Sequence, residues 1–378
     1  LIQLAPVPAH IVKEHGLLWI EPENIVTCGP YLLESWDKER AIVLKRNPDY
    51  YGNFVGNVAG VEIRFIENAS EIIESYEADE LDVVDLPNEG HWAIQIYPAD
   101  YVSWPEFRTV KVNFNTLRFP FDNRRIRRAL GLATNRRLLA ETAANGLVTP
   151  ATGGYIPLGL PGHRPDIALH YDLEGARRIL TEEGYPGGKG LPLIKAMTHK
   201  TYEHLARALD RFWIEDLGLN IEWQFVEWEE YDRRMESGQI DLLMDGIFAP
   251  TPNLDNLMED MPIPEKYWPG KEFRNLVEKA RRITDPASRM SHYRQAEDIL
   301  LEEIPLFPLH YGQNHLLVKP WIKNYRPAVR FLDGWKDVII EPRKEREPDL
   351  NLPKGTVTFL FTDIQGSTRL LQTLGDKY

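Results

Sequence analysis

The chain has 378 residues, 43% of them hydrophobic and 27% charged, which is typical of globular proteins and long enough for two or three domains. Its net charge of −13 argues against nucleic-acid binding as the main role of these residues. The sequence contains no apolar run of the roughly 18 residues needed to cross a membrane, so it predicts no membrane span. The single cysteine, Cys28, cannot form an internal disulfide.

The apolar pattern predicts an α/β protein with helices packed on the faces of a sheet. Runs rich in β-branched and aromatic residues predict strands at 42–46, 61–66, 108–113, 191–196, 221–226 and 241–246. Helical periodicity predicts helices at 69–78, 124–144, 173–183, 202–216, 228–236, 272–283 and 287–301. Asp172 can cap the helix that follows it, and Asp285-Pro286 ends one helix and starts the next. Arg125, Arg127 and Arg128 are expected to be surface cations on an early helix.

Residues 341–353 are predicted to form a linker, because three prolines and seven charged side chains there interrupt any apolar periodicity. A buried strand is predicted at 356–362, with Asp363 at its end. Gly366 then permits a tight turn into a new helix. A carboxylate beside free backbone N–H groups can hold a metal–phosphate, although Asp363 could also serve only as a helix cap.

The run FTDIQGST within residues 355–378 resembles the opening of a class III adenylate/guanylate cyclase domain, which has a ferredoxin-like fold. The resemblance implies that Asp363 binds Mg²⁺ or Mn²⁺ and that Ile364, Gln365 and Gly366 offer backbone N–H groups to phosphates. A second metal-binding aspartate would lie beyond Tyr378, so these residues alone are expected to be catalytically inactive. The complete domain would act as a homodimer. Because the chain starts at Leu1 and ends within this motif, we expect it to be a fragment.

An ordered set of short motifs lies before the linker: CGPY at 28–31, NPDYYG at 47–52, ELDVV at 80–84, VNFNT at 112–116, PFDN at 120–123, RIRRAL at 125–130, DLGL at 216–219, SGQID at 237–241 and EIPLFPL at 303–309. Their order and spacing resemble the family 5 extracellular solute-binding proteins, the oligopeptide, dipeptide and nickel receptors of ABC importers. The resemblance covers about residues 6–327.

This resemblance implies a two-lobed, periplasmic-binding-protein-like fold of type II, the Venus-flytrap, over residues 1–340. Lobe I would comprise about 1–113 and 313–340, without its N-terminal part, and lobe II about 114–312. The chain would cross between the lobes near Phe114-Asn115 and Tyr311-Gly312. The linker and the truncated cyclase start, residues 354–378, would follow.

The resemblance also implies a ligand cleft with six candidate residues: Tyr31, Trp36, Asn115, Asp245, Phe248 and Tyr311. For Tyr31 and Trp36 the sequence favours a structural role, as core or cleft-rim aromatics, over ligand contact. Peptide receptors of this family place an aspartate after the strand that contains Asp241, where it pairs with the peptide's terminal amine. Phe248 or Ala249 occupies that position here and Asp245 lies too early, so the ligand could be a solute other than a free peptide.

Three functions fit the sequence. The first is a solute-sensing cytoplasmic cyclase that makes a cyclic nucleotide, because a short linker without a membrane span joins the binding region to the cyclase start. The second is a periplasmic or extracellular, lipid-anchored receptor that delivers peptide or nickel to an ABC permease. The third is a solute-responsive transcriptional regulator with a DNA-binding domain upstream. The sequence predicts a peptide-like or other small solute as the ligand.

Overall fold

The structure is a computed structural model that describes residues 7–86, 90–249, 253–259, 263–325 and 334–343. The chain divides into two compact units, Leu1–Ile340 and Glu341–Tyr378, and every element described below belongs to the first. The predicted strand and turn at 356–366 lie outside the described residues.

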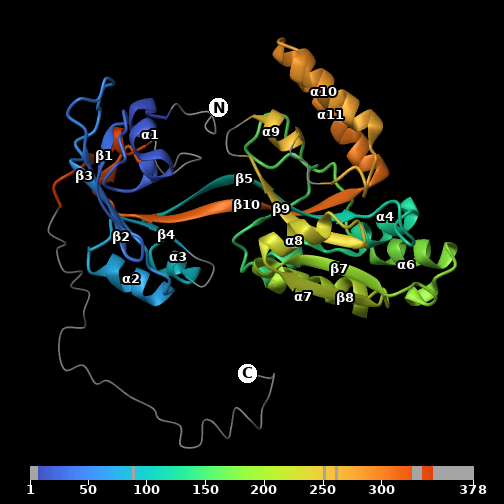
Figure 1. The fold of residues 1–378 in the computed structure, drawn as a ribbon. Helices are drawn as coiled ribbons and strands as arrows, with labels where there is room; N and C mark the ends of the chain where they lie inside the picture. Colours follow the sequence, from blue (N-terminus) through green and yellow to red (C-terminus); the bar gives the residue numbers. More distant parts are fainter. Residues whose placement is uncertain (1–6, 87–89, 250–252, 260–262, 326–333, 344–378) are drawn as a thin grey trace, which may run out of the picture. The chain divides into compact units, whose positions relative to one another are not determined.

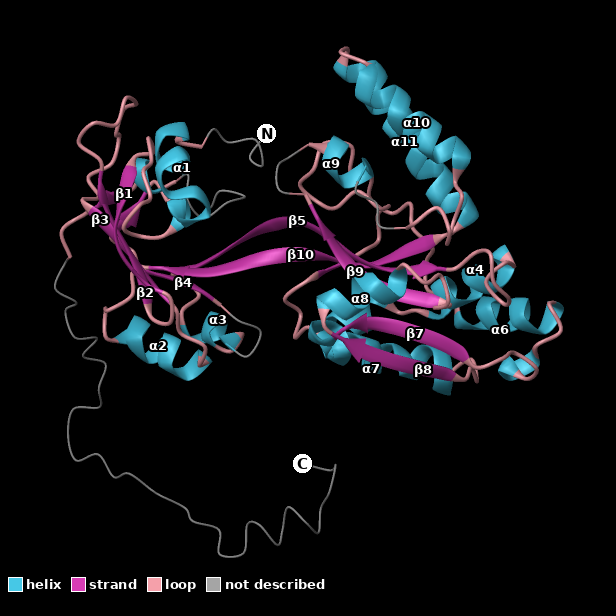
Figure 2. Cartoon of the chain, in the orientation of Figure 1, coloured by secondary structure: helices cyan, strands magenta, loops and turns pink. Residues whose placement is uncertain are grey.

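Helices and strands alternate along the described residues (Figures 1 and 2). The strands are β1 (Tyr31–Asp37), β2 (Ala41–Arg46), β3 (Gly60–Arg64), β4 (Val83–Asp85), β5 (Tyr101–Phe114), β6 (Thr149–Pro150), β7 (Ile194–His199), β8 (Ile221–Val226), β9 (Leu242–Phe248), β10 (Leu306–Val318), β11 (Ile322–Lys323) and β12 (Ile339–Ile340). The α-helices are α1 (Ala9–His15), α2 (Ala69–Glu77), α3 (Ala93–Ile96), α4 (Arg124–Ala133), α5 (Arg136–Ala143), α6 (Leu173–Glu182), α7 (Glu203–Asp210), α8 (Trp228–Met235), α9 (Leu254–Glu259), α10 (Lys271–Arg282) and α11 (Pro286–Glu303).

The largest sheet among the described residues has seven strands, in the order β4-β10-β5-β9-β7-β8 with β6 paired to β10. The long strands β5 and β10 run antiparallel from Leu306 opposite Asn113 to Leu317 opposite Tyr101, and they lie side by side in Figure 1. The central strand β5 also pairs with β9, which continues into the parallel pair β7 and β8. Strands β1, β2 and β3 form a separate antiparallel sheet.

The buried apolar side chains form separate cores along the same sheet. Two small cores draw on residues 31–101 and 317–338, and they centre on Tyr76 and Val338. Two larger cores draw on residues 107–309, and the fully buried Trp213 lies in one of them. Strands β5 and β10 contribute side chains to cores of both groups, so they connect the two halves of the described chain.

Several sequence predictions of helix ends are confirmed. Asp172 accepts a hydrogen bond from the backbone N–H of Gly175 at 2.8 Å and caps α6. Asp285 caps α11 in the same way, and Pro286 is its first residue. The single helix predicted at 124–144 is wrong, because Thr134 leaves the helical conformation and Asn135 caps a second helix.

The prediction that Arg127 is a surface cation is also wrong. Its side chain is buried, and its guanidinium donates hydrogen bonds to the carbonyl oxygens of Phe121 at 2.6 Å and Ile304 at 2.8 Å. Arg127 therefore ties α4 to the end of α11, a role that helical periodicity could not reveal.

Candidate functional site

The middle of the large sheet carries charged side chains on both of its faces. In the pairing of β5 with β9, Arg108 lies opposite Phe248 and Lys111 lies opposite Asp245. Successive side chains of a strand point to opposite faces, so residues three positions apart lie on different faces. Arg108 and Phe248 therefore share one face, and Lys111 and Asp245 share the other.

We call the residues of the first face the Arg108 cluster: Glu106, Arg108, Tyr202, Phe248 and His310. Arg108 donates a hydrogen bond from Nη2 to Glu106 Oε1 at 2.8 Å, and its guanidinium carbon lies 5.9 Å from the centre of the Phe248 ring. The side chain of Arg108 is 39% exposed and that of Glu106 is 21% exposed. Burial acts to lower the pKa of Arg108, but the Glu106 carboxylate outweighs it and raises the pKa.

Two glycines make room for this cluster. A Cβ at Gly246 would lie 2.4 Å from the Tyr202 hydroxyl oxygen, and a Cβ at Gly312 would lie 2.3 Å from Glu106 Oε2. The Tyr202 ring and the Glu106 carboxylate therefore pack directly against strand backbone. Burial raises the pKa of Tyr202 and the charge of Arg108 partly offsets that rise, so the hydroxyl stays protonated at neutral pH.

His310 completes the cluster from β10. It pairs with Val110, which shares a face with Arg108 because the two residues are two positions apart. Its side chain is only 9% exposed, and Nδ1 has no hydrogen-bond partner among the described residues; the same is true of Arg108 Nε. Burial, with smaller contributions from the charges of Arg108 and His204, lowers the pKa of His310 to about 4. Buried polar atoms without partners are uncommon, and a bound ligand or water is one explanation for them.

The opposite face holds a buried network, here called the Lys111 network: Lys111, Asn113, Tyr231 and Asp245. Asn113 Oδ1 is buried without a partner among the described residues. Lys111 is fully buried, and its Nζ forms an ion pair with Asp245 Oδ1. Asp245 Oδ2 accepts hydrogen bonds from Asn113 Nδ2 at 3.1 Å and from the Tyr231 hydroxyl at 2.8 Å. Burial lowers the pKa of Lys111 and raises that of Tyr231. Both carboxylate oxygens are occupied, so this network holds the strands together.

Two of the predicted cleft residues thus lie on β9, three positions apart and on different faces of the sheet. Asp245 belongs to the Lys111 network and Phe248, 39% exposed, belongs to the Arg108 cluster. Asn115 donates from Nδ2 to the carbonyl oxygens of Gly238 and Ile240, both at 3.1 Å, and its side chain is buried. Its contacts serve the turn before β9.

The other predicted cleft residues do not join the cluster: Tyr311 follows His310 on β10 but points to the opposite face, and Tyr31 and Trp36 lie on β1. The Tyr311 hydroxyl donates to the carbonyl oxygen of Gly154 at 2.7 Å and is buried. Tyr31 lies in a small core, where its hydroxyl donates to the carbonyl oxygen of Trp335 at 3.1 Å. Trp36 lies at the other end of β1, 38% exposed, with Lys38 Nζ 5.8 Å from its ring centre. Asp363, Ile364, Gln365 and Gly366 lie outside the described residues.

Sequence reasoning missed Glu106, Arg108, Tyr202 and His310. One signal was available: Glu106 and Arg108 stand two residues apart, on one face of a run that continues as the apolar strand 109–114. A pair of opposite charges inside a long strand, rather than at its ends, indicates a partly open position in the sheet.

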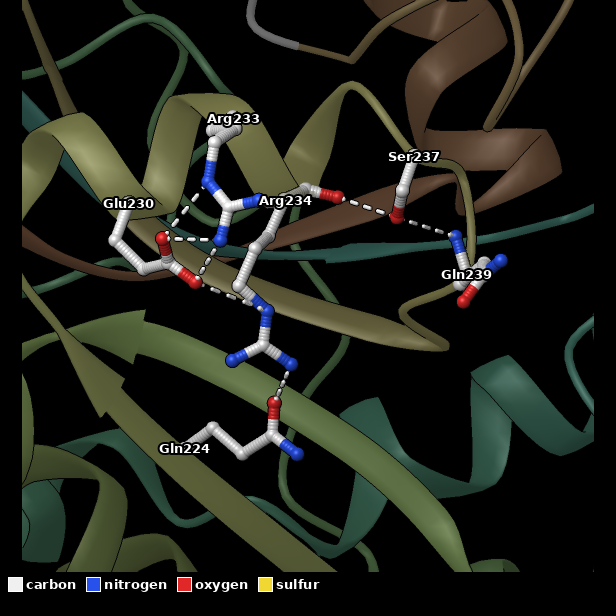
Figure 3. Close-up of polar contacts among 6 residues, drawn as sticks. All are labelled: Gln224, Glu230, Arg233, Arg234, Ser237 and Gln239. Carbon is white, nitrogen blue, oxygen red and sulfur yellow. Dashed lines mark hydrogen bonds and ion pairs between the residues drawn. The ribbon is translucent and has the colours of Figure 1, made fainter.

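A second charged group lies on α8, and Figure 3 shows its contacts. Arg233 donates from Nε to Glu230 Oε2 at 2.9 Å, and Arg234 donates to Gln224 Oε1 of β8. The Ser237 hydroxyl donates to the carbonyl oxygen of Arg234 at 2.7 Å and closes the helix end. Every charged group in this set has a partner, so we assign it to holding α8 on β8.

A cavity of about 290 Å³ lies between β3 and β4. Its lining is mostly apolar and includes Ile63, Val84 and Leu316. The lining also includes the charged residues Glu62, Arg64 and Asp85, and Trp335, whose buried Nε1 has no partner among the described residues. We place the candidate site at the Arg108 cluster because it lies on β5 and β10, the two strands that connect the cores, and holds two unpartnered buried nitrogen atoms.

Within the described ranges, no helix has the length and apolar content to cross a membrane. The same residues contain no group of three or more histidine, cysteine, aspartate or glutamate side chains placed to bind a metal ion.

Residues 1–266 match the family model described as bacterial extracellular solute-binding proteins, family 5 Middle. The chain is 29% identical over 340 residues to the probable deoxycholate-binding periplasmic protein YgiS of Escherichia coli. It is 27% identical over 338 residues to the periplasmic oligopeptide-binding protein OppA of Salmonella typhimurium. Each alignment covers 85% of this chain and 62% of the relative, so the chain spans less than two thirds of the length of these proteins.

Solved structures share the fold. A periplasmic oligopeptide-binding protein, OppAIV, from Borrelia burgdorferi superposes with a TM-score of 0.67 at 23% identity, over 88% of this chain and 68% of that one. Haemophilus influenzae OppA, in complex with RPPGFSPFR, superposes with a TM-score of 0.66 at 22% identity, over 89% of this chain and 69% of that one. The predicted α/β, two-lobed, periplasmic-binding-protein-like fold is thus confirmed for the solute-binding region.

Proposed function

Because the chain belongs to the bacterial extracellular solute-binding proteins of family 5, we propose that it is the ligand-binding part of a receptor that delivers a peptide-like solute to an ABC importer. The Arg108 cluster is the proposed contact with the solute. The observation that carries this proposal is the partly exposed ion pair of Glu106 and Arg108 beside His310, whose Nδ1 is buried without a partner. These residues lie on β5 and β10, the two strands that connect the cores.

The chemistry of the cluster supports a peptide-like solute. A peptide carries charged ends, amide N–H groups and carbonyl oxygens, which match a carboxylate, a guanidinium and a buried imidazole nitrogen. The half-exposed Phe248 ring offers apolar contact beside them. Two relatives are named as periplasmic, which supports a location outside the cytoplasm in place of the cytoplasmic one expected from the sequence.

The experiment is equilibrium dialysis of the full-length protein against mixed tri- to pentapeptides, with mass spectrometry of the retained fraction. We expect peptides to be retained and Arg108→Ala to weaken their binding by about 10- to 100-fold, since hydrogen bonds to charged groups contribute roughly 1.5–3 kcal/mol. The matched control is Arg64→Ala on β3, outside the cluster, which removes ion pairs with Glu62 at 2.8 Å and Glu80 at 3.2 Å. It should leave binding unchanged.

Deoxycholate is the second probe, because one relative is named for it. Retention of deoxycholate without retention of any peptide would overturn the proposal of a peptide-like solute. Equal binding by the Arg108→Ala variant and the unchanged protein would overturn the placement of the site.

A second candidate function rests on the FTDIQGST run within residues 355–378. We propose that a longer protein with this run is a solute-sensing adenylate/guanylate cyclase, with Asp363 holding Mg²⁺ or Mn²⁺ and Ile364, Gln365 and Gly366 near the phosphates. Its catalytic unit would be a homodimer, and ATP or GTP would require a cytoplasmic location. The comparisons favour the receptor, because the family match lies within residues 1–266.

The cyclase proposal is tested by measuring cyclic AMP and cyclic GMP formed by the full-length protein with Mg²⁺ or Mn²⁺. Asp363→Asn is expected to reduce the rate at least about 100-fold, because a metal ion that activates the attacking hydroxyl would lose a charged ligand. The matched control is Asp349→Asn in the linker. Activity that survives Asp363→Asn, or none in the unchanged protein, would exclude this function.

A further inference from the structure

The Glu106 carboxylate is placed to recognise a positive charge on the ligand. We propose that Glu106 binds the ammonium group of the solute, which is the terminal amine in the case of a peptide. This inference rests on the proposed function. It adds that the ligand carries a positive charge and that Glu106 is the residue that binds this charge.

Asp245, the carboxylate nearest in sequence to the expected amine-binding position, is not available for this role. Its Oδ1 is paired with Lys111, and its Oδ2 accepts from Asn113 and Tyr231. A ligand ammonium that displaced Lys111 would leave that lysine buried without a counter-charge, which is strongly unfavourable. The residue is also only 4% exposed, so a ligand could reach it only if side chains packed over that face, such as Tyr231 of α8, moved aside.

Glu106 has both the access and the free capacity that Asp245 lacks. Its side chain is 21% exposed, and Arg108 binds Oε1. The other oxygen, Oε2, occupies the space over Gly312, and no hydrogen bond to it is recorded among the described residues. A carboxylate can accept several hydrogen bonds, so Oε2 can take an ammonium while Oε1 stays with Arg108.

The charges around Glu106 favour a cation. Burial raises the pKa of Asp85 on β4, and the nearby charge of Glu106 raises it further, so the two carboxylates repel each other. Arg108 supplies one positive charge against these two negative ones, while Lys111 and Asp245 cancel on the other face. His310 is neutral at pH 7, because its pKa is about 4. An ammonium group beside Glu106 would be attracted by both carboxylates.

A second observation points independently to a polar ligand at this place. His310 is more than nine-tenths buried, lies on the same face as Arg108, and has an unpartnered Nδ1. Arg108 Nε is buried and unpartnered as well. A ligand carbonyl or amide beside the ammonium would satisfy such atoms, as the backbone of a peptide does.

The test compares two peptide pools in equilibrium dialysis with the full-length protein: mixed tri- to pentapeptides with free amines, and the same pool acetylated at its amines. We expect the free pool to bind at least about tenfold more tightly, because acetylation removes a charge-assisted hydrogen bond. Glu106→Gln should abolish this preference by weakening only the binding of free peptides. The control is Glu62→Gln, which alters the pair of Glu62 with Arg64, two residues apart on β3. This variant should keep the preference for free peptides.

The thermal midpoints of both variants are measured alongside, and Glu106→Gln should match Glu62→Gln, which separates loss of recognition from loss of folding. Equal binding of free and acetylated peptides by the unchanged protein would overturn this inference while the proposed function stands. A preference that persists in Glu106→Gln would overturn it too. If neither pool binds, the proposed function fails and the inference fails with it.

Discussion

Replacing Lys111 by methionine is expected to lower the free energy of unfolding by about 3–5 kcal/mol, the range for breaking a buried ion pair by removing one partner. The cause is the Asp245 carboxylate, which is 4% exposed and would keep only the hydrogen bonds from Asn113 and Tyr231. The variant retains the length and apolar stem of the lysine, so packing changes little. Urea unfolding followed by circular dichroism measures the difference.

Two controls make the Lys111 prediction specific. Lys45→Met, on β2, removes an exposed lysine whose Nζ lies 3.9 Å from Glu34 Oε1, and its effect should be within about 1 kcal/mol. The double variant Lys111→Met with Asp245→Leu should recover much of the lost stability, because no unpaired charge remains. A loss below about 1 kcal/mol in the single variant would contradict a buried network.

The second large effect is a pH dependence of stability that comes from His310. Burial, the first cause, lowers its pKa in the folded protein to about 4 from the ordinary value of 6.5. Between these pH values the unfolded chain binds a proton at this residue and the folded protein does not, so the free energy of unfolding rises with pH. The contribution is complete above about pH 6.5 and is lost as the pH falls towards 4; its full size is about 3 kcal/mol.

The measurement compares the unchanged protein with His310→Gln by urea unfolding at several pH values between 4 and 7. The difference in unfolding free energy between the two should grow as the pH rises, whatever the absolute stability of the variant. Burial also lowers the pKa of His315, so part of the pH dependence should remain in the variant. A difference that is constant over this range would show that His310 does not stay neutral in the folded protein.

The two faces of the sheet have different roles because of how their charges are satisfied. The Lys111 network has a partner for both oxygens of its carboxylate, so it stabilises the fold and its disruption should unfold the protein. The Arg108 cluster is partly exposed and leaves two buried nitrogen atoms unpartnered. Changes to its partly exposed members, Glu106 and Arg108, should alter binding more than stability.

The sequence by itself determined the fold class, the family and most of the helices. Local signals were sufficient where local chemistry decides the outcome, as for the caps Asp172 and Asp285, which bind the backbone within three residues. The strand predicted at 108–113 lies inside β5, but its true length, Tyr101–Phe114, depends on pairing with β10, which is distant in sequence. The break at Thr134 was missed for a similar reason, since Thr134 is buried and its hydroxyl oxygen accepts from Trp213 Nε1 at 3.0 Å.

Only the tertiary structure decided which charged residues meet. Asp245 and Phe248 were candidates from their position, and the alternation of side chains along β9 puts them on opposite faces. Only the register of β9 on β5 brings Asp245 to Lys111 and Phe248 to Arg108. Glu106 and His310 are far apart in sequence and reach one site because β5 pairs with β10. Register and burial are properties of strands brought together in space, and a shift of one residue would exchange the two faces. No local pattern in a single sequence contains that information.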